Sequence, residues 1–186
     1  MKGMTKLLIV AALFFLPLGC VSCNRMPVPQ EKAKDIAMKD ELVKQSEQLR
    51  VKNKKLAPDF QLLDTRQDRI SLKDYRGKQP VLLFFWTTLC PLCEEELRIL
   101  NDSYPSLVSD GLEVLAIDVA ERPSKVEEFI KAFHLTYRVL LDMDTSVAVA
   151  YRVFGVPTYV LIDKEGSIVF QDNYFPQNEY KKLIQE

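Results

Sequence analysis

Six consecutive apolar residues run almost directly into a pair of cysteines, and this junction limits most strongly what the chain can fold into. Val81–Trp86 reads Val-Leu-Leu-Phe-Phe-Trp, which predicts a strand buried on both faces of a sheet. A helical pattern begins at Pro91, and the missing N–H of proline suits the first turn of a helix. Cys90 and Cys93 therefore stand where a buried strand passes into a helix.

Two thiols three residues apart at the start of a helix have a particular chemistry. Unpaired N–H groups and the positive end of the helix dipole stabilise an anion there, so a thiol at Cys90 loses its proton more readily. Cys93 follows one turn later and can close a disulfide with Cys90. The pattern predicts a redox-active cysteine pair.

Composition narrows the class of protein. The 186 residues are 47% hydrophobic with a formal net charge of −1, which suits one domain with a real core and lacks the basic character of nucleic-acid-binding proteins. The four cysteines are too few for a disulfide scaffold, and a single histidine leaves little room for imidazole metal sites. We therefore expect no nucleic-acid partner, no metal and no cofactor.

Residues 1–19 have the pattern of a secretory signal. Lys2 and Lys6 precede an apolar run, Leu7–Leu18, which is shorter than the roughly 20 residues of a spanning helix. Cys20 then predicts lipoprotein processing, although Pro17 stands where leucine is usual. Lipid anchoring at Cys20, simple cleavage and a retained N-terminal anchor stay open. All three place the domain outside the cytoplasm, in the periplasm or at the outer face of the membrane.

Residues 20–55 predict a charged linker. Apolar residues recur at spacings of four and seven, which favours a solvated helical spacer over a short coiled-coil arm: Met38, Leu42, Leu49 and Leu56. Cys20 and Cys23 form a second C-x-x-C. A second redox pair, or half of a zinc site shared with Cys90 and Cys93, is the less favoured interpretation, because it requires the signal region to survive and fold.

The domain predicted for residues 56–186 alternates between strand and helix patterns. Strands are expected at 59–63, 69–71, 81–86, 112–119, 138–141, 158–163 and 167–171, and helices at 91–108, 123–133, 145–151 and 178–185. Pro105 is expected to kink or split the first of these helices. The order predicts an α/β fold with a mixed central sheet covered by helices on both faces.

Five motifs carry a resemblance to a known family. They are Ala57-Pro58-Asp59-Phe60, the Trp-x-x-x-Cys-x-x-Cys of Trp86–Cys93, Glu96, Gly155-Val156-Pro157-Thr158 and Leu161-Ile162-Asp163-Lys164-Glu165-Gly166. In this order the chain resembles the TlpA/ResA group of extracytoplasmic thiol–disulfide oxidoreductases, in the AhpC/TSA–redoxin superfamily. The resemblance covers residues 56–186. It implies a thioredoxin-like fold with an N-terminal β-hairpin extension and an αβ insertion at 120–151.

The resemblance also implies roles for individual residues. Cys90 would be the exposed nucleophile, Cys93 the shielded resolving thiol, Pro157 a cis-proline facing the pair, and Glu96 a carboxylate influencing thiol ionisation and proton transfer. Side chains expected to contact substrate are Trp86, Pro91, Leu92, Val156 and Thr158.

The implied partners follow from the same resemblance. They are protein dithiols or disulfides, with apocytochrome c or another metalloprotein as a client, and a membrane thiol reductant as electron donor. Membrane attachment would run through the N-terminus.

Departures from the family pattern bear on the redox potential. Thioredoxin carries a buried aspartate where this chain has Phe84, and Leu92 cannot donate a hydrogen bond to a thiolate. Glu94, Glu95 and Glu96 oppose negative charge at Cys90. We therefore expect a reducing rather than a strongly oxidising pair.

Two other functions stay open. A peroxiredoxin-like peroxidase shares the threonine three residues before its cysteine, here Thr87, but Leu83 replaces the expected proline. A copper-delivery protein would use thiolates with a distant histidine, and His134 is the only histidine. We expect His134 to be a solvated or capping residue.

Overall fold

The computed structural model describes residues 38–39, 41–42, 44–45 and 55–185. The chain divides into two units, Met1–Ser46 and Glu47–Glu186. The described residues of the first unit are helical and exposed. The predicted signal at 1–19, Cys20 and Cys23 lie outside the described residues. No helix within the described ranges has the length and apolar character needed to cross a membrane.

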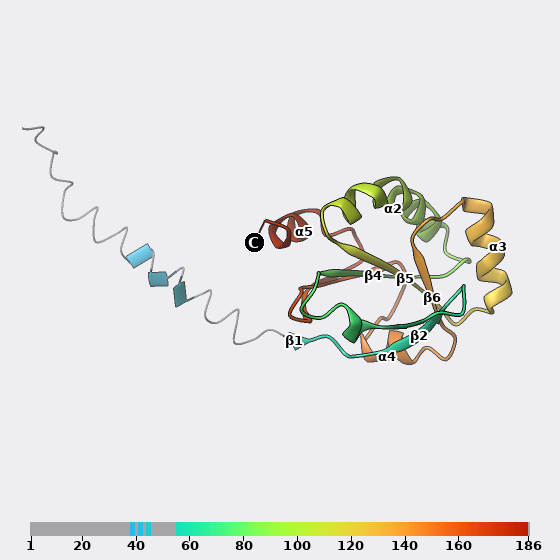
Figure 1. The fold of residues 1–186 in the computed structure, drawn as a ribbon, viewed down its shortest axis with the longest axis horizontal. Coiled ribbons are helices and arrows are strands. Elements are labelled where there is room, and N and C mark those ends of the chain that lie inside the picture. The colour runs from blue at the N-terminus through green and yellow to red at the C-terminus, as the bar shows by residue number, and fades with distance from the viewer. Residues whose placement is uncertain (1–37, 40, 43, 46–54, 186) are drawn as a thin grey trace, which may run out of the picture. The chain divides into compact units, whose positions relative to one another are not determined.

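Eight strands among the described residues form one mixed sheet in the order β1-β8-β7-β4-β5-β6-β2-β3 (Figure 1). β4, β5 and β6 run parallel to one another, and the remaining neighbours are antiparallel. The strands are β1 (Lys55–Leu56), β2 (Gln61–Asp64), β3 (Arg69–Ser71), β4 (Val81–Trp86), β5 (Glu113–Val119), β6 (Arg138–Asp142), β7 (Thr158–Ile162) and β8 (Ser167–Asp172).

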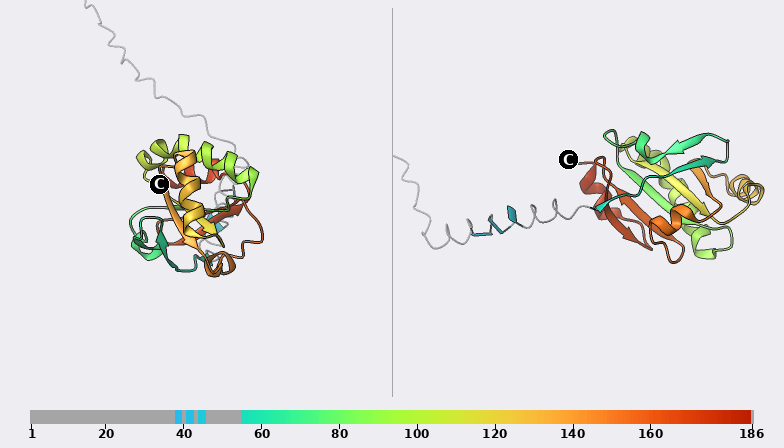
Figure 2. Two further views of the ribbon diagram at one scale, coloured as in Figure 1. Left: turned by 90° about the vertical axis from the view of Figure 1, so that its right-hand side faces the viewer. Right: turned by 90° about the horizontal axis from the view of Figure 1, so that it is seen from below.

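Helices cover both faces of this sheet (Figures 1 and 2). One face packs against α2 (Pro91–Ser109), α3 (Pro123–Phe133) and α5 (Gln177–Leu183), and the other against the short helices η1 (Leu72–Asp74) and α4 (Ser146–Ala150). The predicted α/β class and mixed sheet are confirmed.

β4 lies at the centre because each of its six side chains is apolar. All six are buried, with relative exposures of 0–1%. Side chains alternate along a strand, so Phe84 and Trp86 join the cluster beneath α2 while Leu83 and Phe85 join the cluster on the opposite face. Burial on both sides fixes β4 tightly, and the end of β4 therefore provides a rigid base for the cysteine pair.

The structure differs from the expected elements in two places. Lys55–Leu56 forms strand β1 against β8, whereas the sequence pattern placed Leu56 at the end of a helical stripe; backbone pairing with a distant strand overrode the local spacing. Helix α2 is one continuous element through Pro105, so the predicted split is wrong. Pro105 is exposed, and there water can bond the carbonyl that loses its partner.

Candidate functional site

The two cysteines form a disulfide at the N-terminus of α2, as predicted. Their Cα atoms are 5.1 Å apart. Cys90 is the N-cap residue, and its Sγ accepts a hydrogen bond of 3.1 Å from the backbone N–H of Cys93. Cys90 is partly exposed and Cys93 is 0% exposed. The geometry therefore gives the two sulfurs different access to solvent.

The loop before β7 brings Pro157 to the cysteine pair. β7 runs antiparallel to β4 with Thr158 opposite Phe85, so Pro157 lies level with the end of β4, where the chain turns towards Cys90. The Val156–Pro157 peptide bond is cis, which confirms the sequence prediction. The carbonyl oxygen of Val156 is 3.7 Å from the Sγ of Cys90. This carbonyl is therefore placed to accept a hydrogen bond from the Cys90 thiol in the reduced protein.

A groove of about 400 Å³ adjoins this loop. It brings the cis-proline Pro157 together with three residues predicted to contact substrate: Leu92, Val156 and Thr158. Phe154, which the sequence reasoning did not single out, also lines the groove and is 97% exposed. Its exposed ring is the signal that marks it, since a fully solvated phenylalanine beside a reactive pair is available for contact with another protein.

Trp86 lies beneath the site and not on its surface. It is 0% exposed, and its ring packs against Phe129 with centroids 5.1 Å apart. Pro91, by contrast, is exposed at the first helical position. Trp86 therefore supports the site from below, while the substrate contact predicted for Pro91 is sterically open.

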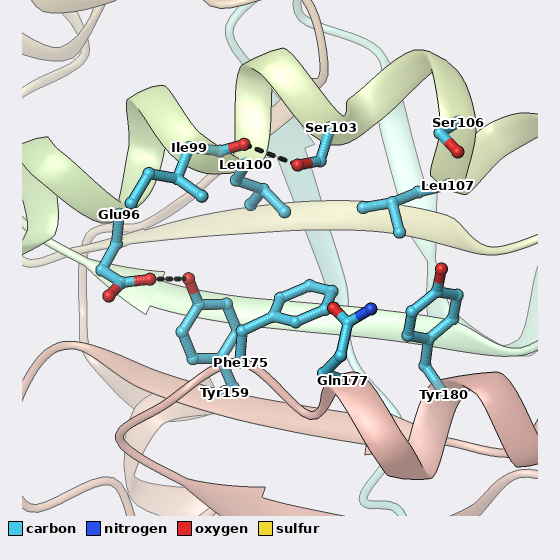
Figure 3. Close-up of a pocket in the computed structure, with 10 residues that line it drawn as sticks. All are labelled: Glu96, Ile99, Leu100, Ser103, Ser106, Leu107, Tyr159, Phe175, Gln177 and Tyr180. Atoms are coloured by element: carbon cyan, nitrogen blue, oxygen red, sulfur yellow. Dashed lines mark hydrogen bonds between the residues drawn. The ribbon is translucent and has the colours of Figure 1, made fainter.

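Glu96 lies three residues after Cys93 on α2, and its side chain points towards Tyr159 (Figure 3). The hydroxyl of Tyr159 donates a 2.7 Å hydrogen bond to Oε2 of Glu96. Burial, followed by this bond and the charge of Glu96, raises the pKa of Tyr159 far above its ordinary value, so the hydroxyl keeps its proton at physiological pH. Glu96 and Tyr159 form one end of a cavity of about 520 Å³ between α2 and the Phe175–Tyr180 segment.

Replacing Tyr159 by phenylalanine removes this bond while keeping the ring. We expect the free energy of unfolding to fall by about 1 kcal/mol, because Glu96 is partly exposed and water replaces the lost donor in part. Urea denaturation followed by circular dichroism measures the change. Tyr174→Phe, at a 55% exposed position, is the matched control and should stay within about 0.5 kcal/mol of wild type. Equal stability of the two variants would contradict the hydrogen bond.

A buried acidic pair beside the site was missed. Asp118 lies between the apolar residues Ile117 and Val119 of β5 and is 1% exposed. A carboxyl inside such an apolar strand is the signal that could have found it. Burial, with the adjacent carboxyl of Glu121, raises its pKa to about 8. Burial opposes ionisation of Glu121, but its interaction with Asp118 and its hydrogen bonds from Lys125 and Thr88 outweigh that cost and lower the pKa of Glu121 to about 2.

The raised pKa of Asp118 predicts a pH-dependent stability. The folded state holds this proton up to about pH 8, whereas in the unfolded chain the carboxyl ionises near its ordinary pKa of 3.8. The stabilisation is complete below that value and is lost as the pH rises towards 8. We therefore expect the free energy of unfolding to fall between pH 5 and 8, and Asp118→Asn to reduce this slope. The lowered pKa of Glu121 changes the free energy of unfolding only below its ordinary pKa of 4.5, which lies outside the range from pH 5 to 8. A parallel slope in the variant would refute the assignment.

His134 takes the capping position that the sequence suggested. It is the C-cap of α3 with φ +51°, and its backbone N–H bonds the carbonyl of Ile130. The imidazole is exposed. Within the described part of the chain no group of three or more His, Cys, Asp or Glu side chains could hold a metal ion. Thr87, the residue shared with peroxidases, accepts the N–H of Cys90 through its carbonyl at 3.3 Å.

Known proteins are similar to this chain in sequence. The thiol-disulfide oxidoreductase ResA of Geobacillus kaustophilus is 43% identical over 112 residues, covering 60% of this chain and 64% of that protein. ResA of Bacillus subtilis is 40% identical over 113 residues, covering 61% and 63% respectively. The chain thus spans a little under two thirds of the length of these relatives.

Solved structures agree with the fold. The thioredoxin domain of a thiol-disulfide oxidoreductase from Bacteroides vulgatus superposes with a TM-score of 0.61 at 24% identity, covering 70% of this chain and 94% of that domain. The predicted thioredoxin-like fold is therefore confirmed.

The model of the AhpC/TSA family matches residues 54–171. This match takes in the sheet from β1 to β8 with both cysteines and the cis-proline loop. Together with the identity to ResA, it confirms the resemblance stated from the sequence motifs. The chain belongs to the AhpC/TSA family.

Proposed function

We propose that the protein is a thiol–disulfide oxidoreductase that reduces protein disulfides outside the cytoplasm. One observation carries this proposal: the partly exposed Cys90 is bonded to the buried Cys93 at a helix N-terminus, 3.7 Å from the Val156 carbonyl. This arrangement makes the sulfur of Cys90 accessible to a partner protein and leaves the buried sulfur of Cys93 to resolve the mixed disulfide. The similar proteins are named thiol-disulfide oxidoreductases, which supports the same activity.

The proposed reaction passes two electrons to the client. The thiolate of Cys90 attacks one sulfur of the client disulfide, so that a mixed disulfide forms and the other client sulfur leaves as a thiolate, which takes up a proton. Cys93 then loses its proton and attacks the Sγ of Cys90. The mixed disulfide breaks, the client leaves as a dithiol, and the Cys90–Cys93 disulfide is restored. A membrane-bound dithiol would return the pair to its reduced form.

Several side chains would assist these steps. The N–H of Cys93 and the start of α2 stabilise the thiolate of Cys90. Glu96, held by Tyr159, is one turn from Cys93 and would take part in its proton transfer. The backbone of Val156 would pair with an extended client segment, next to Thr158 and Leu92 in the same groove. Pro91, exposed at the start of α2, would be open to contact with the client. Trp86 would keep the end of β4 rigid beneath them.

The clients we propose are exported proteins that need a free cysteine pair to bind a metal or haem, such as apocytochrome c. The N-terminal signal pattern supports an extracytoplasmic location, with attachment through a lipid at Cys20. The charged segment at 20–55 would then space the domain from the membrane.

Reduction of insulin disulfides tests the activity. The reduced protein should accelerate insulin precipitation in dithiothreitol, and a glutathione titration should show a two-electron transition of the Cys90–Cys93 pair within the physiological range. A pair that stays in one state over that whole range, together with no insulin reduction, would overturn the proposal. Consumption of hydrogen peroxide at a faster rate than insulin reduction would favour the peroxidase instead.

A second measurement separates the copper-delivery alternative. Tight binding of Cu(I) by the wild-type protein, lost in His134→Ala, would favour that function. We expect equal Cu(I) binding by the two proteins, since the His134 imidazole is exposed at the end of α3.

A further inference from the structure

The turn that carries Cys90 is fastened from a distant part of the chain. Thr88 lies in the segment between β4 and Cys90, and its backbone N–H donates to Oε2 of Glu121 at 2.6 Å. The Thr88 hydroxyl donates to the other carboxylate oxygen at 2.7 Å. Both carboxylate oxygens of Glu121 thus accept hydrogen bonds from the same residue, Thr88. The N–H of Cys90 donates to the carbonyl of Thr87 within the same turn. The position of Thr88 therefore affects the position of Cys90.

Glu121 is itself held firmly. Its side chain is only 8% exposed, and the ammonium of Lys125 lies 2.5 Å from Oε1. The preceding residue, Ala120, has φ +65°, a left-handed conformation that is unfavourable for an alanine. The N–H of Ala120 bonds the carbonyl of Asp142. A strained residue fixed in this way directs the Glu121 side chain towards the cysteine turn.

Asp118 completes the arrangement from below. Val114 and Ala116 of the same strand belong to the cluster that contains Cys93, and by alternation Asp118 lies on that face. Among the described residues, neither of its carboxyl oxygens has a hydrogen-bond partner of ordinary geometry. Its strongest electrostatic interaction is with the carboxyl of Glu121, and the backbone of Glu121 and the charge of Lys125 act more weakly in the opposite direction. Two carboxyl groups can share a hydrogen bond only when one keeps its proton. Glu121 already accepts hydrogen bonds from Thr88 and Lys125, and Asp118 is the more deeply buried of the two, with 1% exposure, so the proton belongs on Asp118.

We propose that Glu121 and Asp118 are positioning residues for Cys90, in which ionised Glu121 fastens the Thr87–Leu89 turn and neutral Asp118 donates to Glu121 and holds it in place. Neither residue touches the reacting sulfurs in this arrangement. Their effect on Cys90 is transmitted through Thr88 and the backbone of the turn. The inference rests on the proposed reactivity of Cys90 and adds residues that the proposed mechanism does not use.

The protonation state of Asp118 then affects the reactivity of Cys90. When Asp118 loses its proton, two buried carboxylates repel each other, and the hydrogen bonds between Glu121 and Thr88 weaken. The charged groups acting on Asp118 are Glu121 and Lys125. The neighbouring strands place Trp86 and Leu141 opposite it in register, and neither of these titrates. From α2, Cys93 lies on the same face and titrates only in the reduced protein.

Alkylation of reduced Cys90 by iodoacetamide, measured from pH 6 to 10, tests the inference without any client protein. Thr88→Val keeps the size of the side chain and removes its donor, and we expect alkylation at pH 7 to slow by about threefold to tenfold, a part of what a charge-assisted hydrogen bond contributes. Thr88→Ser restores the hydroxyl and should stay within about twofold of wild type. The wild-type profile should show a second inflection near pH 8, and Asp118→Asn should remove it.

The outcomes are distinct. Equal rates for Thr88→Val and Thr88→Ser, with the second inflection retained in Asp118→Asn, would overturn the proposal. If Thr88→Val does not fold, as judged by circular dichroism, Thr88→Ala is compared with Thr88→Ser in its place. Insulin reduction by the wild-type protein is measured in parallel. Failure of insulin reduction alone would contradict the proposed function and leave the positioning of Cys90 intact. Unchanged alkylation in all variants would contradict the positioning of Cys90 and leave the proposed function intact.

Discussion

Cys93→Ser is expected to hold client proteins as stable mixed disulfides, whereas Cys90→Ser is expected to hold none. The reason is the unequal access of the two sulfurs: Cys90 is partly exposed beside Val156, while Cys93 is 0% exposed. Without Cys93 the mixed disulfide on Cys90 cannot be resolved. Without Cys90 the remaining thiol is out of reach. Expression in the native host, followed by non-reducing electrophoresis and mass spectrometry, identifies the trapped proteins.

The same two variants should lose insulin reduction by about 10³-fold or more, because a covalent step has lost one of its two sulfurs. Ser103→Ala, an uninvolved position on α2, is a control that should keep full activity. Equal trapping by both cysteine variants would show that Cys93 is reachable and would contradict the burial of its sulfur. Trapping of haem- or metal-binding proteins by Cys93→Ser would support the proposed client class.

Phe84→Ala is expected to give the largest loss of stability, about 3–5 kcal/mol. Phe84 is 0% exposed in the central strand and its ring packs on Tyr159 with centroids 4.5 Å apart. Removing it leaves a cavity between the sheet and α2 that its neighbours can fill only in part. Guanidinium denaturation, followed by circular dichroism, measures the change in the free energy of unfolding.

Phe154→Ala is the matched control for this substitution. It removes the same atoms from a side chain that is 97% exposed, so the free energy of unfolding should change by less than about 0.5 kcal/mol. A similar loss in both variants would mean that the core around β4 is not packed as described. Phe154→Ala also reports on the groove, since its activity on a protein disulfide can be compared with its unchanged stability.

Much of the fold followed from local patterns. The strand Val81–Trp86 and the helix Pro123–Phe133 have the predicted bounds, because an apolar run and an amphipathic repeat each determine their own secondary structure. The short strand Lys55–Leu56 did not follow, since two residues carry no periodicity. Its existence depends on pairing with β8, more than 100 residues away in sequence.

In the candidate site, too, the features set by local sequence were predicted, whereas those set by distant contacts were not. The cysteine pair, its helix and the cis-proline were predicted from motifs that lie within single short segments. The role of Tyr159 as donor to Glu96 was not predicted, because nothing near either residue in sequence refers to the other. Trp86 was expected to contact substrate, but its place on the inner face of the sheet buries it completely.

The sequence by itself therefore determined the chemistry of this protein: two thiols at a helix start, the buried strand that supports them and the class of reaction they suit. The tertiary structure alone decided which groups surround those thiols. Glu121 reaches Thr88 across 33 positions of the chain, and burial, together with the neighbouring Glu121, raises the pKa of Asp118. Local sequence sets backbone preferences and side-chain reactivity, whereas burial and long-range hydrogen bonds arise only when distant segments pack together.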